Sequence, residues 1–212
     1  MRTADLIAAL AADTPPLKPV RVKSRLAGAC LLGALVTGAV LVVWLGLRPL
    51  GEAVQTTAFW MKAGYTSALA LTGFLLAIRL ARPEGRLGRV LAIAILAVVV
   101  MVSLAMIEMM RAGPGGMRPL MMGHSWSVCS LRILALSVPV YFGAILVLRQ
   151  LAPTRLAIAG AAAGLLAGGV GASVYGLYCA ETAATFVVTW YTLGIAASAA
   201  LGAVIGSRLL RW

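Results

Sequence analysis

The sequence predicts an all-α integral membrane protein, namely a six-transmembrane-helix bundle with a short cytoplasmic N-terminal tail. Of its 212 residues, 62% are hydrophobic and 11% are charged, whereas soluble domains are about half apolar and a quarter charged. The mean hydropathy of +0.99 agrees with this composition. The apolar residues form continuous runs rather than an alternating pattern. We therefore expect helices, and not a β-barrel, to satisfy the backbone inside the membrane.

Six apolar runs, bounded by charged residues, proline or glycine, predict six spans. At about 20 residues per span, the chain has room for these helices and for short connections. We predict the spans at 26–47, 58–78, 87–107, 128–148, 156–178 and 184–205. The predicted domains are a cytoplasmic tail at 1–25 and a six-helix transmembrane domain at 26–212.

The predicted tail begins with an amphipathic stretch, TADLIAALAAD. Asp5 falls in its first turn, where the helix dipole favours an acid, and Leu6, Ile7 and Leu10 recur at helical spacing. The proline-rich segment 15–20 would end this helix and continue as an extended spacer. So short a helix is unstable alone in water. Its apolar face would rest in a groove on a cytoplasmic partner or on the lipid, unless the terminus is frayed.

Lysine and arginine are distributed unequally between the two predicted sides of the membrane. Of the 18 basic residues, thirteen fall on the side of the N-terminus and five on the other side. The five are Arg48, Lys62, Arg111, Arg118 and Arg132. Because positive charge near span ends resists translocation, both termini are predicted to be cytoplasmic. The charges are dispersed beside span ends, which is typical of topology signals and anionic-lipid contact rather than of nucleic-acid binding.

Small residues indicate where the predicted helices touch. Gly160, Gly164 and Gly168 lie on one ridge of the fifth span, and Gly202 and Gly206 repeat this spacing in the last span. Spacing by four residues lets two helix backbones approach closely. We interpret both ridges as packing faces rather than as parts of a substrate path.

Several activities lack the residues they need, so the chain is not expected to be an enzyme. No Asp or Glu lies in the middle of an apolar run, which argues against a proton-coupled transporter. The chain has one histidine, His124, which excludes a bis-histidine haem and a multi-histidine zinc site within one chain. The glycine-rich piece AGPGG at 112–116 lacks the strand and lysine of a phosphate loop, and is interpreted as a loop.

The polar residues left near the spans gather on the predicted extracytoplasmic side. Cys129 and Cys179 fall at a similar membrane level, with Glu108, His124 and Glu181 as auxiliary groups nearby. The spacing leaves open whether the two cysteines pair, because both would have to face the helix seam or lie on flexible ends. A thiol/disulfide change and capture of a soft metal ion by the two sulfurs are both open, and the nearby acids fit the metal route slightly better. We expect no resident cofactor.

The C-terminal part of the sequence resembles that of a known protein family. The stretch from Cys129 through LAPTRLAIAGAAAGLLAGG and YGLYCAE to WYTLGIAASAALGAVIGSRLLRW resembles the NrsF/OsrA-like negative regulators of extracytoplasmic-function sigma factors. These are six-span proteins of the bacterial inner membrane. The resemblance implies an anti-sigma function and a pair of extracytoplasmic cysteines involved in stress signalling, which would fall on Cys129 and Cys179.

Under this resemblance, the tail helix becomes the sigma-binding element. Leu6, Ile7 and Leu10 would be its apolar anchors, and Asp5 would meet basic residues on the sigma factor. The leading hypothesis is a membrane anti-sigma factor that sequesters its partner and releases it on an extracytoplasmic thiol or metal signal. The rivals are a small uncoupled channel or transporter and, further behind, a membrane thiol oxidoreductase, against which the absence of a CxxC motif argues.

Overall fold

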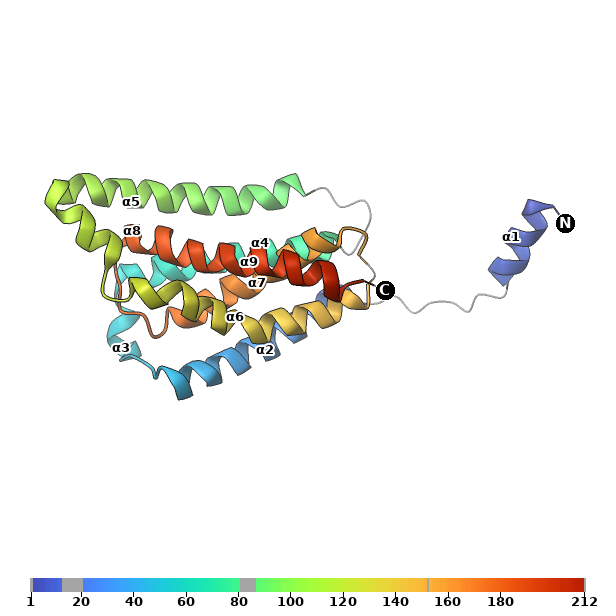
Figure 1. Ribbon diagram of the computed structural model, residues 1–212, viewed down its shortest axis with the longest axis horizontal. Coiled ribbons are helices and arrows are strands. Elements are labelled where there is room, and N and C mark those ends of the chain that lie inside the picture. Colours follow the sequence, from blue (N-terminus) through green and yellow to red (C-terminus); the bar gives the residue numbers. More distant parts are fainter. Residues whose placement is uncertain (1, 13–20, 81–86, 152, 212) are drawn as a thin grey trace.

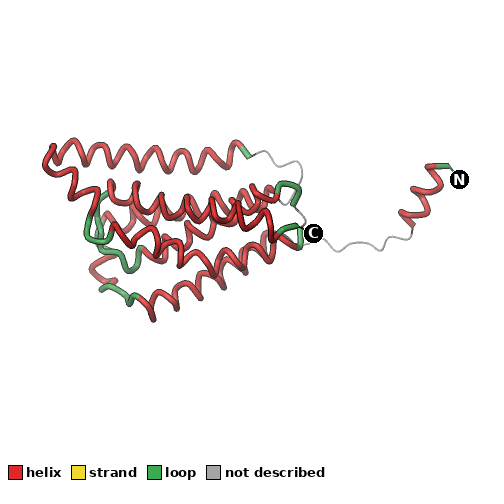
Figure 2. Tube along the Cα trace, in the orientation of Figure 1, coloured by secondary structure: helices red, strands yellow, loops and turns green. Residues whose placement is uncertain are grey.

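The computed structural model describes residues 2–12, 21–80, 87–151 and 153–211, and all of the regular structure in them is helical (Figures 1 and 2). Nine helices and one π-helical turn follow one another in these ranges. They are α1 (Thr3–Ala12), α2 (Val22–Trp44), α3 (Leu50–Ala53), α4 (Thr57–Leu80), α5 (Gly88–Met122), α6 (Trp126–Arg149), α7 (Leu156–Tyr175), α8 (Ala184–Phe186), the π-helical turn η1 (Val187–Tyr191) and α9 (Thr192–Leu209).

The six predicted spans correspond to helices that are long and apolar enough to cross a membrane. They are provided by α2, α4, α5, α6, α7 and the continuous rod formed by α8, η1 and α9. The rod is helical throughout 184–209, so the π-helical turn widens it locally without ending it. The prediction of an all-helical bundle is confirmed for the described residues. Most helix boundaries differ from the predicted ones by a few residues, but α5 runs to Met122, well beyond the predicted end at 107.

The glycine-rich piece at 112–116 differs from its prediction as a loop. The helix α5 runs for 35 residues, and Gly113 alone within it has non-helical backbone angles, with φ at 68°. This positive φ is readily adopted by glycine because it has no Cβ. The chain therefore breaks at one residue and resumes as helix, which turns the end of α5 toward α6 (Figure 1). The prediction of a loop over the whole piece was wrong.

Helix α7 lies at the centre of the bundle, where it packs against α4, α6 and α9. Its contacting residues are almost all glycine and alanine. A Cβ added to Gly160 would meet the carbonyl oxygen of Gly202 and would lie 2.9 Å from Cα of Gly206. A Cβ on Gly164 would likewise meet the carbonyl oxygen of Ser198. The predicted packing faces are confirmed, and they pack against each other.

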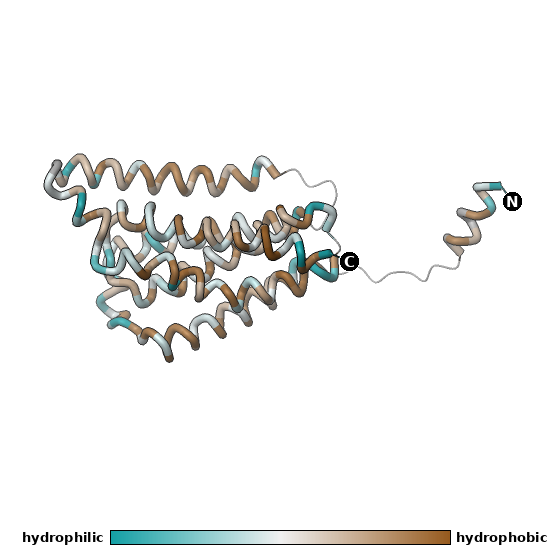
Figure 3. Tube along the Cα trace, viewed as in Figure 1, coloured by the Kyte–Doolittle hydropathy of each residue, from teal (hydrophilic) through white to brown (hydrophobic). Residues whose placement is uncertain are grey.

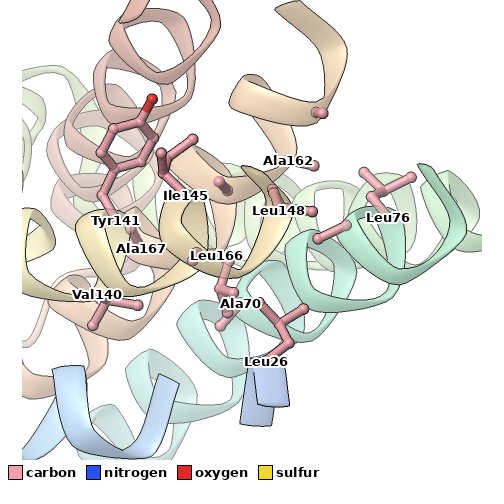
Figure 4. Close-up of a cluster of buried hydrophobic side chains, with 14 of the residues drawn as sticks. Leu26, Ala70, Leu76, Val140, Tyr141, Ile145, Leu148, Ala162, Leu166 and Ala167 are labelled. Atoms are coloured by element: carbon pink, nitrogen blue, oxygen red, sulfur yellow. The ribbon is translucent and has the colours of Figure 1, made fainter. Parts of the chain in front are cut away.

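The antiparallel spans place alternate helix ends at the two ends of the bundle. The start of α2 and the end of α9 lie at one end (Figure 1), which we call the basic end because predicted basic clusters flank its helices. Its core includes Leu26, Leu76 and Leu148, from three different helices (Figure 4). A second core, at the opposite end, contains both Cys129 and Cys179. We call that end the cysteine end.

Hydrophobic residues predominate along the long helices of the bundle (Figure 3). Large side chains such as Leu32 on α2, Ile95 on α5 and Leu146 on α6 are exposed. Exposed apolar area on this scale is far more than soluble monomers carry. The surface is therefore suited to hydrocarbon rather than to water.

The helix α1 forms as predicted and lies apart from the bundle (Figure 1). Its Leu6 and Leu10 side chains are 44% and 64% exposed. The predicted proline-rich spacer at 15–20 lies outside the described residues. The tail therefore presents a short helix with apolar side chains that the bundle does not cover.

Candidate functional site: the buried cysteines

The two cysteines singled out from the sequence lie in one buried core at the cysteine end. Cys129 is in the first turn of α6, and Cys179 is in the segment that joins α7 to α8. Both side chains are almost fully buried, at 0% and 2% exposure, and both are free thiols. Both belong to the same cluster of buried side chains. The structure thus brings together the two residues that the sequence placed at one membrane level.

Two tyrosines extend this core around the sulfurs. Tyr175 ends α7 and Tyr191 ends the π-helical turn, and their ring centroids are 5.8 Å apart. Both hydroxyl groups are buried, and neither has a hydrogen-bond partner within the part of the chain that the structure describes. Unpaired buried polar groups are rare and costly, and they cluster at functional or strained sites. The core around the thiols is therefore not a purely apolar packing core.

A buried cation, Lys62, adjoins the cysteines and was missed as a site residue. Lys62 lies in the second turn of α4 and is only 3% exposed. Its ammonium group donates hydrogen bonds to the backbone carbonyl oxygens of Cys179 at 2.9 Å and Glu181 at 2.7 Å. From the sequence alone, Lys62 was interpreted only as one of the charges that set topology. The available signal was a single lysine inside an apolar run, which is costly unless it has partners.

Glu181 holds the start of α6 in place. Its carboxylate accepts hydrogen bonds from the backbone N–H of His124 at 2.7 Å and from the backbone N–H of Ser125 at 3.2 Å. The hydroxyl group of Ser125 donates to the same oxygen at 3.3 Å. A carboxylate at a helix N-terminus satisfies free N–H groups and is favoured by the helix dipole. Glu181 is thus a cap that joins the Cys179 segment to α6.

Glu108 has a similar role at the start of the last span. It lies on α5, and its carboxylate accepts from the backbone N–H and the hydroxyl group of Thr185. The carboxylates of both predicted auxiliary acids therefore accept hydrogen bonds from groups at the starts of helices. Neither acid is found bonded to a cysteine sulfur among the described residues.

His124 lies at the solvent-exposed edge of this region. Its side chain is fully exposed, and its Nδ1 is 4.0 Å from the Glu181 carboxylate. Within the described residues, no three His, Cys, Asp or Glu side chains gather closely enough to hold a metal ion. The two sulfurs are thus brought together without a third such group beside them.

The predicted partner-binding residues lie far from the cysteine end, on the detached helix α1. Leu6 and Leu10 are exposed there, whereas the side chain of Ile7 lies outside the described residues. The carboxylate of Asp5 accepts a hydrogen bond from the backbone N–H of Arg2 at 3.2 Å, so it caps its own helix. The site residues thus form two separate groups.

These features define a multi-pass helical protein of the membrane type, with a buried pair of thiols at one end and a separate short helix in its tail. The family model described as "Negative regulator of sigma F" matches residues 10–212. The chain belongs to this family, NrsF.

Two relatives match over the full length of both chains. The "Anti-sigma-F factor NrsF" of Caulobacter vibrioides is 41% identical over 221 residues. The "Probable anti-sigma-F factor NrsF" of Azospira oryzae is 38% identical over 213 residues. No solved structure matches the chain.

Proposed function

We propose that this protein is an anti-sigma factor of the bacterial inner membrane that sequesters an extracytoplasmic-function sigma factor through its N-terminal tail. Membership of the NrsF family and the printed names of two full-length relatives support the anti-sigma function. Six helices long and apolar enough to span a membrane support the location. The partner is a sigma factor, and the protein itself contacts no DNA.

The basic end of the bundle faces the cytoplasm in this proposal, together with both termini. Thirteen of the 18 basic residues belong to this side, which is the asymmetry expected of cytoplasmic loops. The cysteine end then faces the periplasm, a compartment that permits disulfides. The sigma factor would meet the tail on one side of the membrane while the signal arrives on the other.

The exposed apolar face of α1 is the observation that carries the sigma-binding role. A ten-residue helix has marginal stability in water, so its apolar side chains gain most from a partner's groove. Leu6 and Leu10 are one helical turn apart and exposed. Ile7 completes the anchor set, and Asp5 supplies a negative charge for basic residues on the sigma factor. Release of the partner then requires only that this one helix be withdrawn.

Cys129 and Cys179 are the input in this proposal, by a thiol/disulfide change or by transient binding of a soft metal ion. Their shared burial supports a role in which both sulfurs act together. The metal route would place an ion between two thiolates, and His124, Glu108 or Glu181 would have to rearrange to complete its coordination. The disulfide route needs the two sulfurs to approach and a two-electron oxidant in the periplasm to accept the electrons and protons of the two thiols, with no further ligand. The smaller rearrangement favours the disulfide route, whereas the sequence had slightly favoured the metal route.

Copurification tests the proposal directly. Full-length protein carrying a C-terminal affinity tag should retain its sigma factor in detergent, and deletion of residues 1–14 should abolish retention. A matched control replaces those residues by a glycine and serine segment of equal length, which should also fail to retain the partner. Retention of the sigma factor by the deleted protein would contradict the role of the tail.

A further inference from the structure

The segment that carries Cys179 is fastened to α4 by one side chain. The ammonium group of Lys62 donates to the carbonyl oxygens of Cys179 and Glu181, which flank a single residue. Cys179 lies just beyond the end of α7, where its backbone N–H donates to the carbonyl oxygen of Tyr175 at 3.0 Å, whereas Cys129 lies within α6. The N–H of Cys179 is therefore held by α7 and its carbonyl oxygen by Lys62, while Cys129 is held by the backbone of α6.

The charge of Lys62 is buried without a contacting carboxylate. Among the described residues, no carboxylate lies within ion-pair distance of Lys62, which has carbonyl oxygens as its hydrogen-bond partners. The ammonium group contacts Cys179 directly through its carbonyl oxygen, and Cys129 belongs to the same buried core as Cys179. A buried cation is costly unless it is hydrogen-bonded or paired. The ammonium group of Lys62 is stabilised by two carbonyl groups, and it lies near two thiols that become anions when they lose a proton.

We propose that Lys62 is a positioning residue of the thiol site, which holds the Cys179 segment on α4 until one of the sulfurs acquires a negative charge. A sulfur that loses its proton to solvent competes with the neutral carbonyl oxygens for the ammonium group. Hydrogen bonds to an ionised acceptor are about twice as strong as those to a neutral one. The ammonium group then turns to the sulfur and frees the main chain at 179–181. Glu181, on the same segment, bonds the two N–H groups just before α6, so this cap is loosened with the segment while α6 keeps its own backbone hydrogen bonds.

The signalling half of this inference rests on the proposed function, but the positioning half does not. Alkylation rates of single-cysteine proteins test the positioning half on full-length protein in lipid nanodiscs. One protein keeps only Cys179 and the other keeps only Cys129. The other two of the three cysteines are replaced by serine in each. Each is treated with N-ethylmaleimide, with and without Lys62→Met. Thr66→Val is the matched control, because Thr66 is equally buried one turn further along α4 and does not contact the segment.

Lys62→Met should speed the alkylation of Cys179 by about tenfold, because the segment opens locally. The alkylation of Cys129 should change by less than about twofold, since α6 keeps its backbone hydrogen bonds. Lys62→Arg should restore the slow rate in part, and Thr66→Val should leave both rates unchanged. Equal acceleration at both cysteines would show general loosening of the bundle and would overturn the inference. An unchanged rate at Cys179 would also overturn it.

A reporter of sigma-dependent transcription tests the signalling half. Cells with the wild-type protein should respond to diamide, an oxidant that takes two electrons and two protons from a pair of thiols to form a disulfide. Cells with Lys62→Met should give the same expression with and without diamide, and Lys62→Arg should restore the response. A normal response in Lys62→Met cells would overturn the signalling half. Such a result would leave the anti-sigma function itself to be judged by the tail deletion.

Discussion

The carboxylate of Glu108 accepts hydrogen bonds from both the backbone N–H and the hydroxyl group of Thr185, each at 2.8 Å. Thr185 is the second residue of the last span, and Glu108 lies on α5, an outer helix of the bundle. An acid on one helix thus caps the N-terminus of another. This contact joins α5 to the bundle at the end where the cysteines lie.

Replacement of Glu108 should therefore act on stability. Glu108→Ala is expected to lower the free energy of unfolding by about 1–2 kcal/mol, because the cap of the last span is lost. Glu108→Gln keeps an acceptor oxygen and should cost less. Unfolding of the purified protein in mixed detergent and SDS, followed by circular dichroism, measures both. An Ala variant as stable as the wild type would show that the cap is unimportant.

The contact between α7 and α9 should tolerate no side chain at Gly160. Gly160→Ala places a methyl group against the backbone at Gly202 and Gly206, and we expect a loss of about 1–3 kcal/mol from overpacking. Gly28→Ala on α2 is the control, because nothing lies within 4 Å of its added Cβ. Unfolding in SDS compares the two variants. Equal stability of both would mean that α7 and α9 separate easily.

The orientation of the bundle can be tested with exposed cysteines, because the native Cys129 and Cys179 are too buried to label rapidly. In a protein that lacks all three native cysteines, His124→Cys and Gln150→Cys introduce exposed thiols just before and just after α6. A membrane-impermeant maleimide should label the first in intact cells and the second only after lysis. The reverse pattern would place the termini outside the cytoplasm.

The apolar face of α1 should be required for repression. Leu6→Asp with Leu10→Asp places two charges in a groove that would bury apolar side chains, so sigma binding should weaken by about 3–5 kcal/mol. Sigma-dependent reporter expression should then be high without stress. Ala4→Asp with Ala12→Asp adds the same charge to exposed positions away from the two leucines and should leave repression nearly intact. Normal repression by the Leu variant, at equal protein levels, would move the binding site elsewhere.

The two cysteines should act as one unit. Cys129→Ser, Cys179→Ser and the double variant should each abolish the response to stress to the same extent, because residues that act together are not additive. The measurement is reporter induction, with non-reducing gels before and after stress to detect a disulfide. A full response in the double variant would reduce both cysteines to packing residues.

The sequence was sufficient for those parts of the fold that depend on composition along the chain. The six spans follow from apolar runs, and the faces of Gly160 and Gly202 follow from spacing by four residues. The break at Gly113 was misread, since glycine and proline predict a loop, whereas one residue with positive φ is enough to turn a helix that then continues.

Partners distant in sequence could not be predicted. Lys62 lies 117 residues from Cys179, and no local pattern indicates that its ammonium group reaches that carbonyl oxygen. Glu108 and Glu181 were recognised as acids near the cysteines, but their roles as caps depend on where the starts of α8 and α6 lie. The membrane level of a residue can be estimated by counting along one helix. Contact between two side chains depends on how several helices rotate and pack.

The central place of α7 has a consequence for biosynthesis. Domains and helices emerge from the ribosome in order, N-terminal first, and spans that are inserted separately pack together afterwards. The helix α4 packs mainly on α7, and α2 packs mainly on α6 and α7, whereas α2 barely touches α4. The first spans to be inserted thus have few partners among themselves. The earlier helices can therefore pack fully only after α7, the fifth long helix to be synthesised, has been inserted between them.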